Sequence, residues 1–200
     1  MKTYRHIAAV AAMLSAAPAL ADMTPAEQQA TLAAHNTERA NYPGVGALMW
    51  APLLAQFAQQ WAQSLADRNA WEHRSQSTLP GVHPTSNPFR PGEWVGENLF
   101  RGGWPPSDPN SMGPAAVALW IAEKQWYHRD LDDGLASAEN KPPGCTAPAG
   151  NYCGHFTQVV WSRTQFVGCG KATATPEMGG RTYIVCNYYP AGNYSNQFPY

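Results

Sequence analysis

Residues 154–170 read GHFTQVVWSRTQFVGCG, and this stretch decides how the C-terminal third of the chain folds. A histidine stands between a glycine and an aromatic residue, and the tail behind it alternates and contains β-branched residues. Such a pattern is typical of a half-buried strand, so we predict a strand over 156–161 that begins directly after His155. A turn over 162–164 and a second strand over 166–172 follow from the same criteria.

The rest of the chain predicts helices first and strands last. Residues 24–27 read TPAE, a capping box with proline at the first helical position, so a helix runs from there to about residue 40. Apolar stripes predict a second helix over about 52–68 and a third over about 114–132. A further strand over 182–188 completes an antiparallel meander with the two strands named above. Helices followed by strands are the α+β pattern.

The N-terminus carries an export signal. Lys2 and Arg5 precede a short apolar run, and the stretch ends in Ala-Leu-Ala at 19–21. We therefore expect residues 1–21 to be a cleaved signal peptide and 22–200 to form a single domain. The apolar run is too short to span a bilayer well, and no later segment is a better candidate. The sequence thus predicts a secreted protein, periplasmic or extracellular in a bacterium, without a transmembrane segment.

Charge and composition narrow the classes of partner. Without Lys2 and Arg5, 11 basic side chains stand against 14 acidic ones, a net charge of about −3. No basic stripe is present, which argues against nucleic acid as a partner. Eight tryptophans, nine tyrosines, 18 prolines and 17 glycines indicate a loop-rich domain held together by aromatic packing and disulfides.

The four cysteines have two possible roles. In an exported chain they most simply form two disulfides, whose pairing the spacing does not determine. A cluster of four thiolates around a metal is the alternative, but no C-x-x-C pair is present. We therefore predict disulfides. The cysteines are Cys145, Cys153, Cys169 and Cys186.

Four polar residues lie in segments with strongly apolar neighbours: His73, Glu97, Glu123 and His155. If they converge, the imidazoles could bind a divalent cation while the carboxylates orient the rings. The same residues could act as general acid and base, or they could form a polar network that only stabilises the fold. Considered singly, each has an ordinary structural explanation, because a histidine at a strand start is more often structural than a ligand.

Several segments resemble signature motifs of the CAP superfamily, which comprises cysteine-rich secretory proteins, insect venom antigen 5 and plant pathogenesis-related 1 proteins. The stretches 154–170 and 183–200 (YIVCNYYPAGNYSNQFPY) are similar to its two signature motifs. AHNTERA at 34–40 resembles its first-helix segment, VGENL at 95–99 its GEN motif, and LWIAEKQWY at 119–127 its third helix. The resemblance covers nearly the whole chain after residue 21, in the right order.

The resemblance implies a tetrad of two histidines and two glutamates in a central cleft. By position these are His73, Glu97, Glu123 and His155. His83 is the competitor of His73, and we favour His73 because it follows the second helix, as the motif expects. The tetrad would hold Zn²⁺ or another divalent cation through His73 and His155, with the two glutamates behind the rings.

The resemblance also implies the fold and the disulfides. It predicts a three-layer α-β-α sandwich around a central antiparallel sheet, with His155 entering the cleft from a strand and Glu97 in a loop above it. Cys169 and Cys186 match positions that pair in some relatives, which leaves Cys145 and Cys153 as the second pair.

Three functions are compatible with such a protein. The first is a non-enzymatic binding module for a divalent cation or for a sterol or fatty acid, since relatives bind such ligands. The aromatic residues Phe89, Trp94, Phe100 and Trp104 could line an apolar groove for a lipid. The second is a hydrolase that uses the tetrad, but no G-x-S-x-G or H-E-x-x-H motif supplies the chemistry, and Ser162 lies in a predicted turn. The third is a structural domain that binds another extracellular protein.

Overall fold

The structure, a computed structural model, describes residues 23–75, 94–103, 108, 110–129 and 142–200. Predictions on other residues lie outside this part of the chain. They are the signal peptide over 1–21, His83, and the aromatic residues Phe89 and Trp104.

A four-stranded mixed sheet forms the middle layer. Its strands, in the spatial order β1-β3-β4-β2, are β1 (Met49–Trp50), β2 (Gly96–Gly102), β3 (Phe166–Thr173) and β4 (Thr182–Tyr189). The long pairs β3–β4 and β2–β4 are antiparallel, as predicted, and the short β1 pairs with β3 in parallel. The segment that we expected to hold Glu97 in a loop is therefore the edge strand β2.

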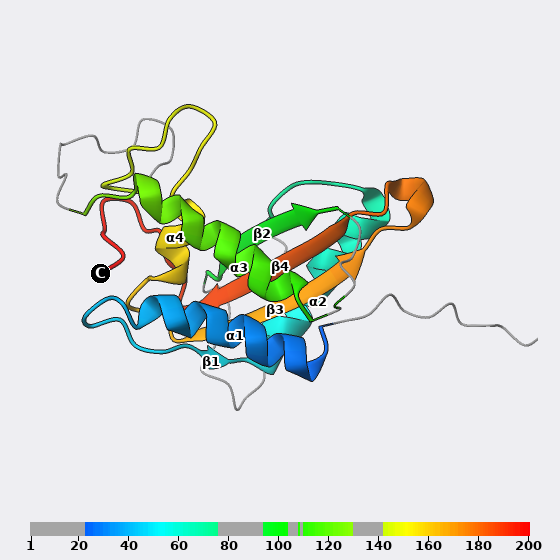
Figure 1. Ribbon diagram of the computed structural model, residues 1–200, viewed down its shortest axis with the longest axis horizontal. Coiled ribbons are helices and arrows are strands. Elements are labelled where there is room, and N and C mark those ends of the chain that lie inside the picture. The colour runs from blue at the N-terminus through cyan, green and yellow to red at the C-terminus, as the bar shows by residue number, and fades with distance from the viewer. Residues whose placement is uncertain (1–22, 76–93, 104–107, 109, 130–141) are drawn as a thin grey trace, which may run out of the picture.

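Helices cover both faces of this sheet. They are α1 (Pro25–Arg39), α2 (Pro52–Arg68), α3 (Met112–Ala122) and α4 (Gly154–Val159), with 3₁₀ turns at Glu123–Trp126 and Pro176–Met178. Figure 1 shows α1 and α3 in front of the sheet, α2 behind it, and α4 at the end of the sheet near the C-terminus. This arrangement confirms the predicted three-layer α-β-α sandwich.

Two glycines let α2 pack close to the sheet. Gly168 and Gly170 of β3 face α2, and a Cβ atom on Gly168 would lie 2.2 Å from the main-chain nitrogen of Ala55. Cys169, between them, points to the opposite face and joins the core beneath α1 and α3. The sequence Gly-Cys-Gly thus reflects the alternation of a strand, with helix contact on one face and a disulfide on the other.

Both predicted disulfides are present. Cys169 and Cys186 are directly opposite in the β3–β4 register, and a disulfide joins them. A second disulfide joins Cys145 to Cys153, which immediately precedes α4.

Two of the three predicted helices have the bounds that we expected, and the third does not. The first two match α1 and α2, and Thr24 caps α1 by accepting a hydrogen bond from the main-chain nitrogen of Glu27 at 3.1 Å. The third begins at Met112, before the predicted start, and tightens into a 3₁₀ turn at Glu123.

The prediction of a strand over 156–161 is wrong, because residues 156–159 belong to α4 and the next two residues follow its end. Residues 156–161 are all buried, so the segment has no exposed face from which a period of two could be distinguished from a helical one.

Distant charged side chains form hydrogen bonds with the main-chain groups at both ends of α4. The carboxylate of Glu123 accepts hydrogen bonds from the first main-chain N–H groups, and the guanidinium of Arg39 donates to carbonyl oxygens of Val159 and Trp161. The negative charge of Glu123 thus lies at the N-terminus of α4 and the positive charge of Arg39 at its C-terminus, where the helix dipole favours each of them.

Candidate functional site

The first histidine of the site is fixed on three sides. His155 is the second residue of α4 rather than the start of a strand, and its Nδ1 lies 2.6 Å from Oε1 of Glu123. The other carboxylate oxygen, Oε2, accepts hydrogen bonds from the main-chain nitrogens of His155 at 2.9 Å and Phe156 at 3.2 Å. The ring of Trp120 stacks against the imidazole, with 15° between the two planes. The orientation of the ring is therefore determined by groups outside α4.

The second histidine forms a matching pair. His73 follows α2, and its Nδ1 lies 2.8 Å from Oε1 of Glu97 on β2. The main-chain nitrogen of Arg74 donates to the same oxygen at 3.1 Å. The His73 side chain is 63% exposed, whereas that of Glu97 is 10% exposed. A rigid strand thus presents a nearly buried carboxylate that holds a solvent-facing imidazole.

Both pairs meet at one cavity of about 510 Å³. His73, Glu97 and His155 line it, whereas Glu123 is not among its lining residues. Glu123 therefore acts from behind His155. The structure brings the two predicted histidines to the same cavity, each with its own carboxylate on Nδ1.

A buried chain of hydrogen bonds connects α1 to the main chain of His155. Nδ1 of His35 donates to the carbonyl of Thr31, so in the neutral ring Nε2 accepts a hydrogen bond from the hydroxyl of Tyr188 at 2.8 Å. Asn98 donates to that hydroxyl oxygen at 3.2 Å and to the carbonyl oxygen of His155 at 3.1 Å. Burial lowers the pKa of His35 from 6.5 to about 4, with a smaller contribution from nearby Arg39, which keeps the ring neutral and its Nε2 an acceptor.

The sequence motifs predicted no role for His35, Asn98 or Tyr188. A signal for His35 was present, since His35 and Arg39 are four residues apart on one helix and so share a face. A histidine and an arginine on a core-facing side indicate buried partners. Nothing local pointed to Tyr188 or Asn98, because their partners lie 57 to 153 residues away.

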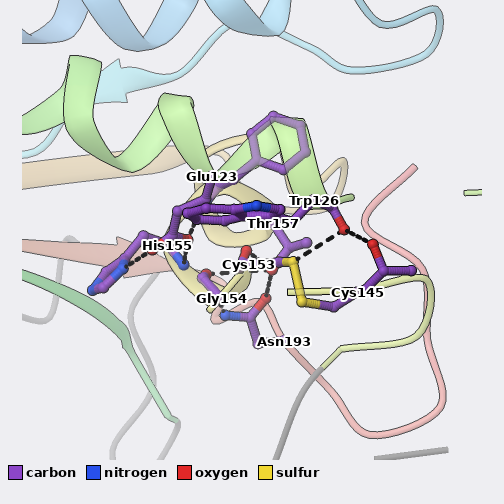
Figure 2. Close-up of a disulfide and its surroundings, with 10 residues drawn as sticks. Glu123, Trp126, Cys145, Cys153, Gly154, His155, Thr157 and Asn193 are labelled. Carbon is purple, nitrogen blue, oxygen red and sulfur yellow. Dashed lines mark hydrogen bonds and ion pairs between the residues drawn. A yellow bond between two sulfur atoms is a disulfide. The ribbon is translucent and has the colours of Figure 1, made fainter. Parts of the chain in front are cut away.

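The turn before His155 is held on its other side. Figure 2 shows the Cys145–Cys153 disulfide on one side of the first turn of α4 and the imidazole of His155 on the other. Asn193 closes the turn from below, donating to the carbonyl of Gly154 at 2.8 Å and accepting from the hydroxyl of Thr157 at 2.7 Å. His155 thus sits on a segment with little freedom to move.

The donor set fits a cation site with few protein ligands. A carboxylate on Nδ1 selects the tautomer that leaves Nε2 free to coordinate a metal. Within the part of the chain that the structure describes, no hydrogen bond occupies Nε2 of His73 or His155. No three His, Cys, Asp or Glu side chains gather into a metal-binding group among these residues. The two imidazoles are therefore the protein ligands that a cation would find here, and water or a bound molecule would fill its other coordination positions.

The same cavity offers no nucleophile among the described residues. Cys153 lines it but is oxidised, and all four cysteines are in disulfides. Ser162 lines neither this cavity nor the neighbouring one that includes Trp94, and its main-chain nitrogen donates to the carbonyl of Pro199. The imidazoles could move protons, but the described lining of the cavity contains no serine or free cysteine for them to activate.

The sequence profile of the cysteine-rich secretory protein family, CAP, matches residues 32–188. The chain belongs to the CAP family. This confirms the resemblance seen in the sequence motifs. The two histidines, the two glutamates and all four cysteines named above fall inside the matched range.

Plant CAP proteins are similar along most of their length. Pathogenesis-related protein 1 of Arabidopsis thaliana is 32% identical over 198 residues, which cover 99% of this chain and 98% of that protein. Pathogenesis-related protein 1A of Nicotiana tabacum is 34% identical over 174 residues, 86% of this chain and 80% of that protein.

Solved CAP structures share the fold at lower identity. The crystal structure of NaASP2 with Zn²⁺ superposes with a TM-score of 0.62 at 21% identity, over 89% of this chain and 86% of that one. Among the described residues of this CAP protein, no helix is both long and apolar enough to cross a membrane.

Proposed function

We propose that this CAP protein is an exported, non-enzymatic binding module that takes up a divalent cation, with Zn²⁺ as the test ion, between His73 and His155. The observation that carries the proposal is the repeated His–carboxylate pair at one cavity, with Nδ1 of each ring held and Nε2 left for a metal. Bound there, the cation would act as a Lewis acid that recruits an oxygen donor of a further ligand.

Export completes the proposal. Residues 1–21 would be removed as a signal peptide, and residues 22–200 would act as a single CAP domain outside the cytoplasm. Two disulfides are compatible with an oxidising compartment, and the name of the family includes secretory proteins. The names of the plant relatives associate them with pathogenesis, so a role at the surface of interacting organisms is the setting we infer.

Cation binding has more support than lipid binding or hydrolysis. NaASP2, which has the same fold, was crystallised with Zn²⁺. Of the aromatic residues proposed for a lipid groove, Phe100 packs half-buried against the core, and only Trp94 lines a cavity among those described. A serine or cysteine hydrolase would need a serine or a free cysteine as nucleophile, and the described lining of the cavity contains neither.

Thermal unfolding with Zn²⁺ tests the proposal. A cation that binds only the folded state stabilises it by about 2.7 kcal/mol at 100 times its Kd. We expect a rise in Tm with ZnCl₂ that EDTA reverses and that His73→Ala and His155→Ala each abolish. His128→Ala is the matched control, since His128 is exposed and lines neither cavity. Binding should also weaken as the pH falls towards about 6, because a protonated imidazole cannot coordinate. An unchanged Tm with every divalent ion tried would refute the proposal.

A further inference from the structure

The exposed aromatic side chains of this protein gather in one place. In the described ranges, four large aromatic side chains are exposed: Trp71, Trp94, Tyr152 and Tyr194. Trp71 and Tyr152 line the cavity that contains His155, and Trp94 and Tyr194 line a second cavity of about 500 Å³. Exposed apolar surface that collects at a concave site marks a binding surface.

The two cavities adjoin. His73, Glu97 and Asn193 line both of them, so they meet along these three residues. Aromatic rings therefore stand on either side of a shared polar line. We treat the two cavities together as one groove, named the aromatic groove below.

The walls of the aromatic groove are polar but carry little net charge. Of their polar side chains, those of His73, Asn193 and Ser195 are exposed, whereas the amides of Asn98, Gln158 and Asn187 are buried and hydrogen-bonded within the protein. The acidic Glu72 and Glu97 are accompanied by Arg74. Hydroxyl and amide groups both donate and accept hydrogen bonds, whereas a site for a charged polymer would concentrate one sign of charge.

Two of the rings have a guanidinium group over one face. That of Arg101 lies 5.1 Å from the ring centroid of Trp71, and that of Arg163 lies 5.6 Å from the ring centroid of Tyr194. Such cation–π contacts favour particular ring positions, although the rings remain exposed. A ligand thus meets flat surfaces that are already oriented.

We propose that the aromatic groove binds a neutral, extended polysaccharide with equatorial linkages. The apolar C–H face of a pyranose ring packs flat on an aromatic side chain, while its hydroxyl groups exchange hydrogen bonds with exposed polar side chains such as those of Asn193, Ser195 and Glu72. Aromatic rings on both sides of the polar residues shared by the two cavities match a chain of several sugar units. A lipid tail would instead favour an enclosed apolar tunnel, and a charged polymer would favour walls of opposite charge.

This site is carried by the exposed aromatic and polar residues of the groove and does not require a bound cation. Since it shares His73 and Glu97 with the proposed cation site, binding is measured in EDTA and again with ZnCl₂. Polysaccharide binding in EDTA supports this inference even if zinc binding fails, and zinc binding without polysaccharide binding supports the proposed function alone.

The test uses the full chain after residue 21. Co-sedimentation with cellulose and with chitin shows whether the protein binds either polymer, and calorimetry with cellohexaose and chitohexaose gives the affinity. We expect binding to at least one, weakened about tenfold or more by Trp94→Ala and by Tyr152→Ala. Trp94→Phe, which keeps a flat ring, should retain more affinity than Trp94→Ala. Leu119→Ala is the control, because Leu119 is exposed on α3 and lines neither cavity.

Three results would overturn the inference. One is that neither polysaccharide binds. The second is that binding is unaffected by Trp94→Ala and Tyr152→Ala, with both variants folded as judged by circular dichroism. The third is that an extended-peptide library binds, the two alanine variants weaken it, and neither oligosaccharide competes, in which case the groove recognises peptides.

Discussion

Glu123 binds His155 twice, once through the ring and once through the main chain. Its Oε1 lies 2.6 Å from Nδ1, and its Oε2 accepts the hydrogen bond of the main-chain N–H at 2.9 Å. One carboxylate therefore orients the imidazole and also satisfies the N-terminus of α4. The candidate ligand and the helix that carries it depend on the same side chain.

Glu123→Gln should consequently reduce both stability and zinc affinity. The amide has one acceptor oxygen where the carboxylate has two, so either the ring or the helix N-terminus loses its partner. Loss of such a partner typically costs about 10–100-fold in metal affinity, and an unsatisfied buried donor costs about 1–3 kcal/mol. Calorimetry with ZnCl₂ and urea denaturation measure the two effects. Glu177→Gln, on an exposed turn, should change neither. Wild-type zinc affinity in Glu123→Gln would show that Glu123 does not orient a ligand.

His35 should make the protein less stable in weak acid. Burial lowers its pKa to about 4 in the folded state, against 6.5 for an unperturbed histidine. Between these values the unfolded chain binds the extra proton, so the stabilisation is complete above pH 6.5 and is lost as the pH falls to about 4. The difference corresponds to about 3 kcal/mol. Urea denaturation of the wild type and of His35→Gln from pH 7 to 4 isolates this contribution, and parallel curves would disprove it.

Gly168→Ala should destabilise the fold because the new Cβ has no room. It would lie 2.2 Å from the main-chain nitrogen of Ala55 and 2.6 Å from the carbonyl oxygen of Ala51. The backbone of α2 must move to accept it, and overpacking of this kind costs about 1–3 kcal/mol or more. Gly46→Ala is the matched control, since nothing lies within 4 Å of its added Cβ. Equal denaturation midpoints for the two variants would contradict the close packing of α2 on β3.

The two disulfides should differ in what their removal affects. In the chain-entropy view the longer Cys169–Cys186 loop contributes about 3.1 kcal/mol and the Cys145–Cys153 loop about 2.5 kcal/mol, from sequence separations of 17 and 8. Paired Cys→Ala variants should follow this order in stability. The order should reverse for zinc affinity, which removal of Cys145–Cys153 should reduce more, because only this disulfide holds the turn that carries His155. A larger loss of zinc affinity on removing Cys169–Cys186 would contradict this assignment.

Much of the fold could be predicted because its signals are local. The TPAE cap and the apolar stripes predicted α1 and α2, and the alternation around Cys169 and Cys186 predicted β3 and β4. The pairing of both disulfides and the identity of the candidate site residues followed from the resemblance to CAP proteins. His73 pairs with Glu97 in the structure, whereas its competitor His83 lies outside the described residues.

Only the tertiary structure decided that GHFTQV forms a helix. Its carbonyl oxygens and N–H groups find partners in Arg39 and Glu123, more than 30 residues away, and all sides of its second half are buried. Periodicity reports a contrast between a buried and an exposed face, and this segment has no such contrast. The sequence by itself therefore determined the order of α1, α2, β3 and β4 and predicted which residues form the candidate site. The packing of the three layers decided how they face one another, because hydrogen bonds between distant elements, rather than local preference, orient His155.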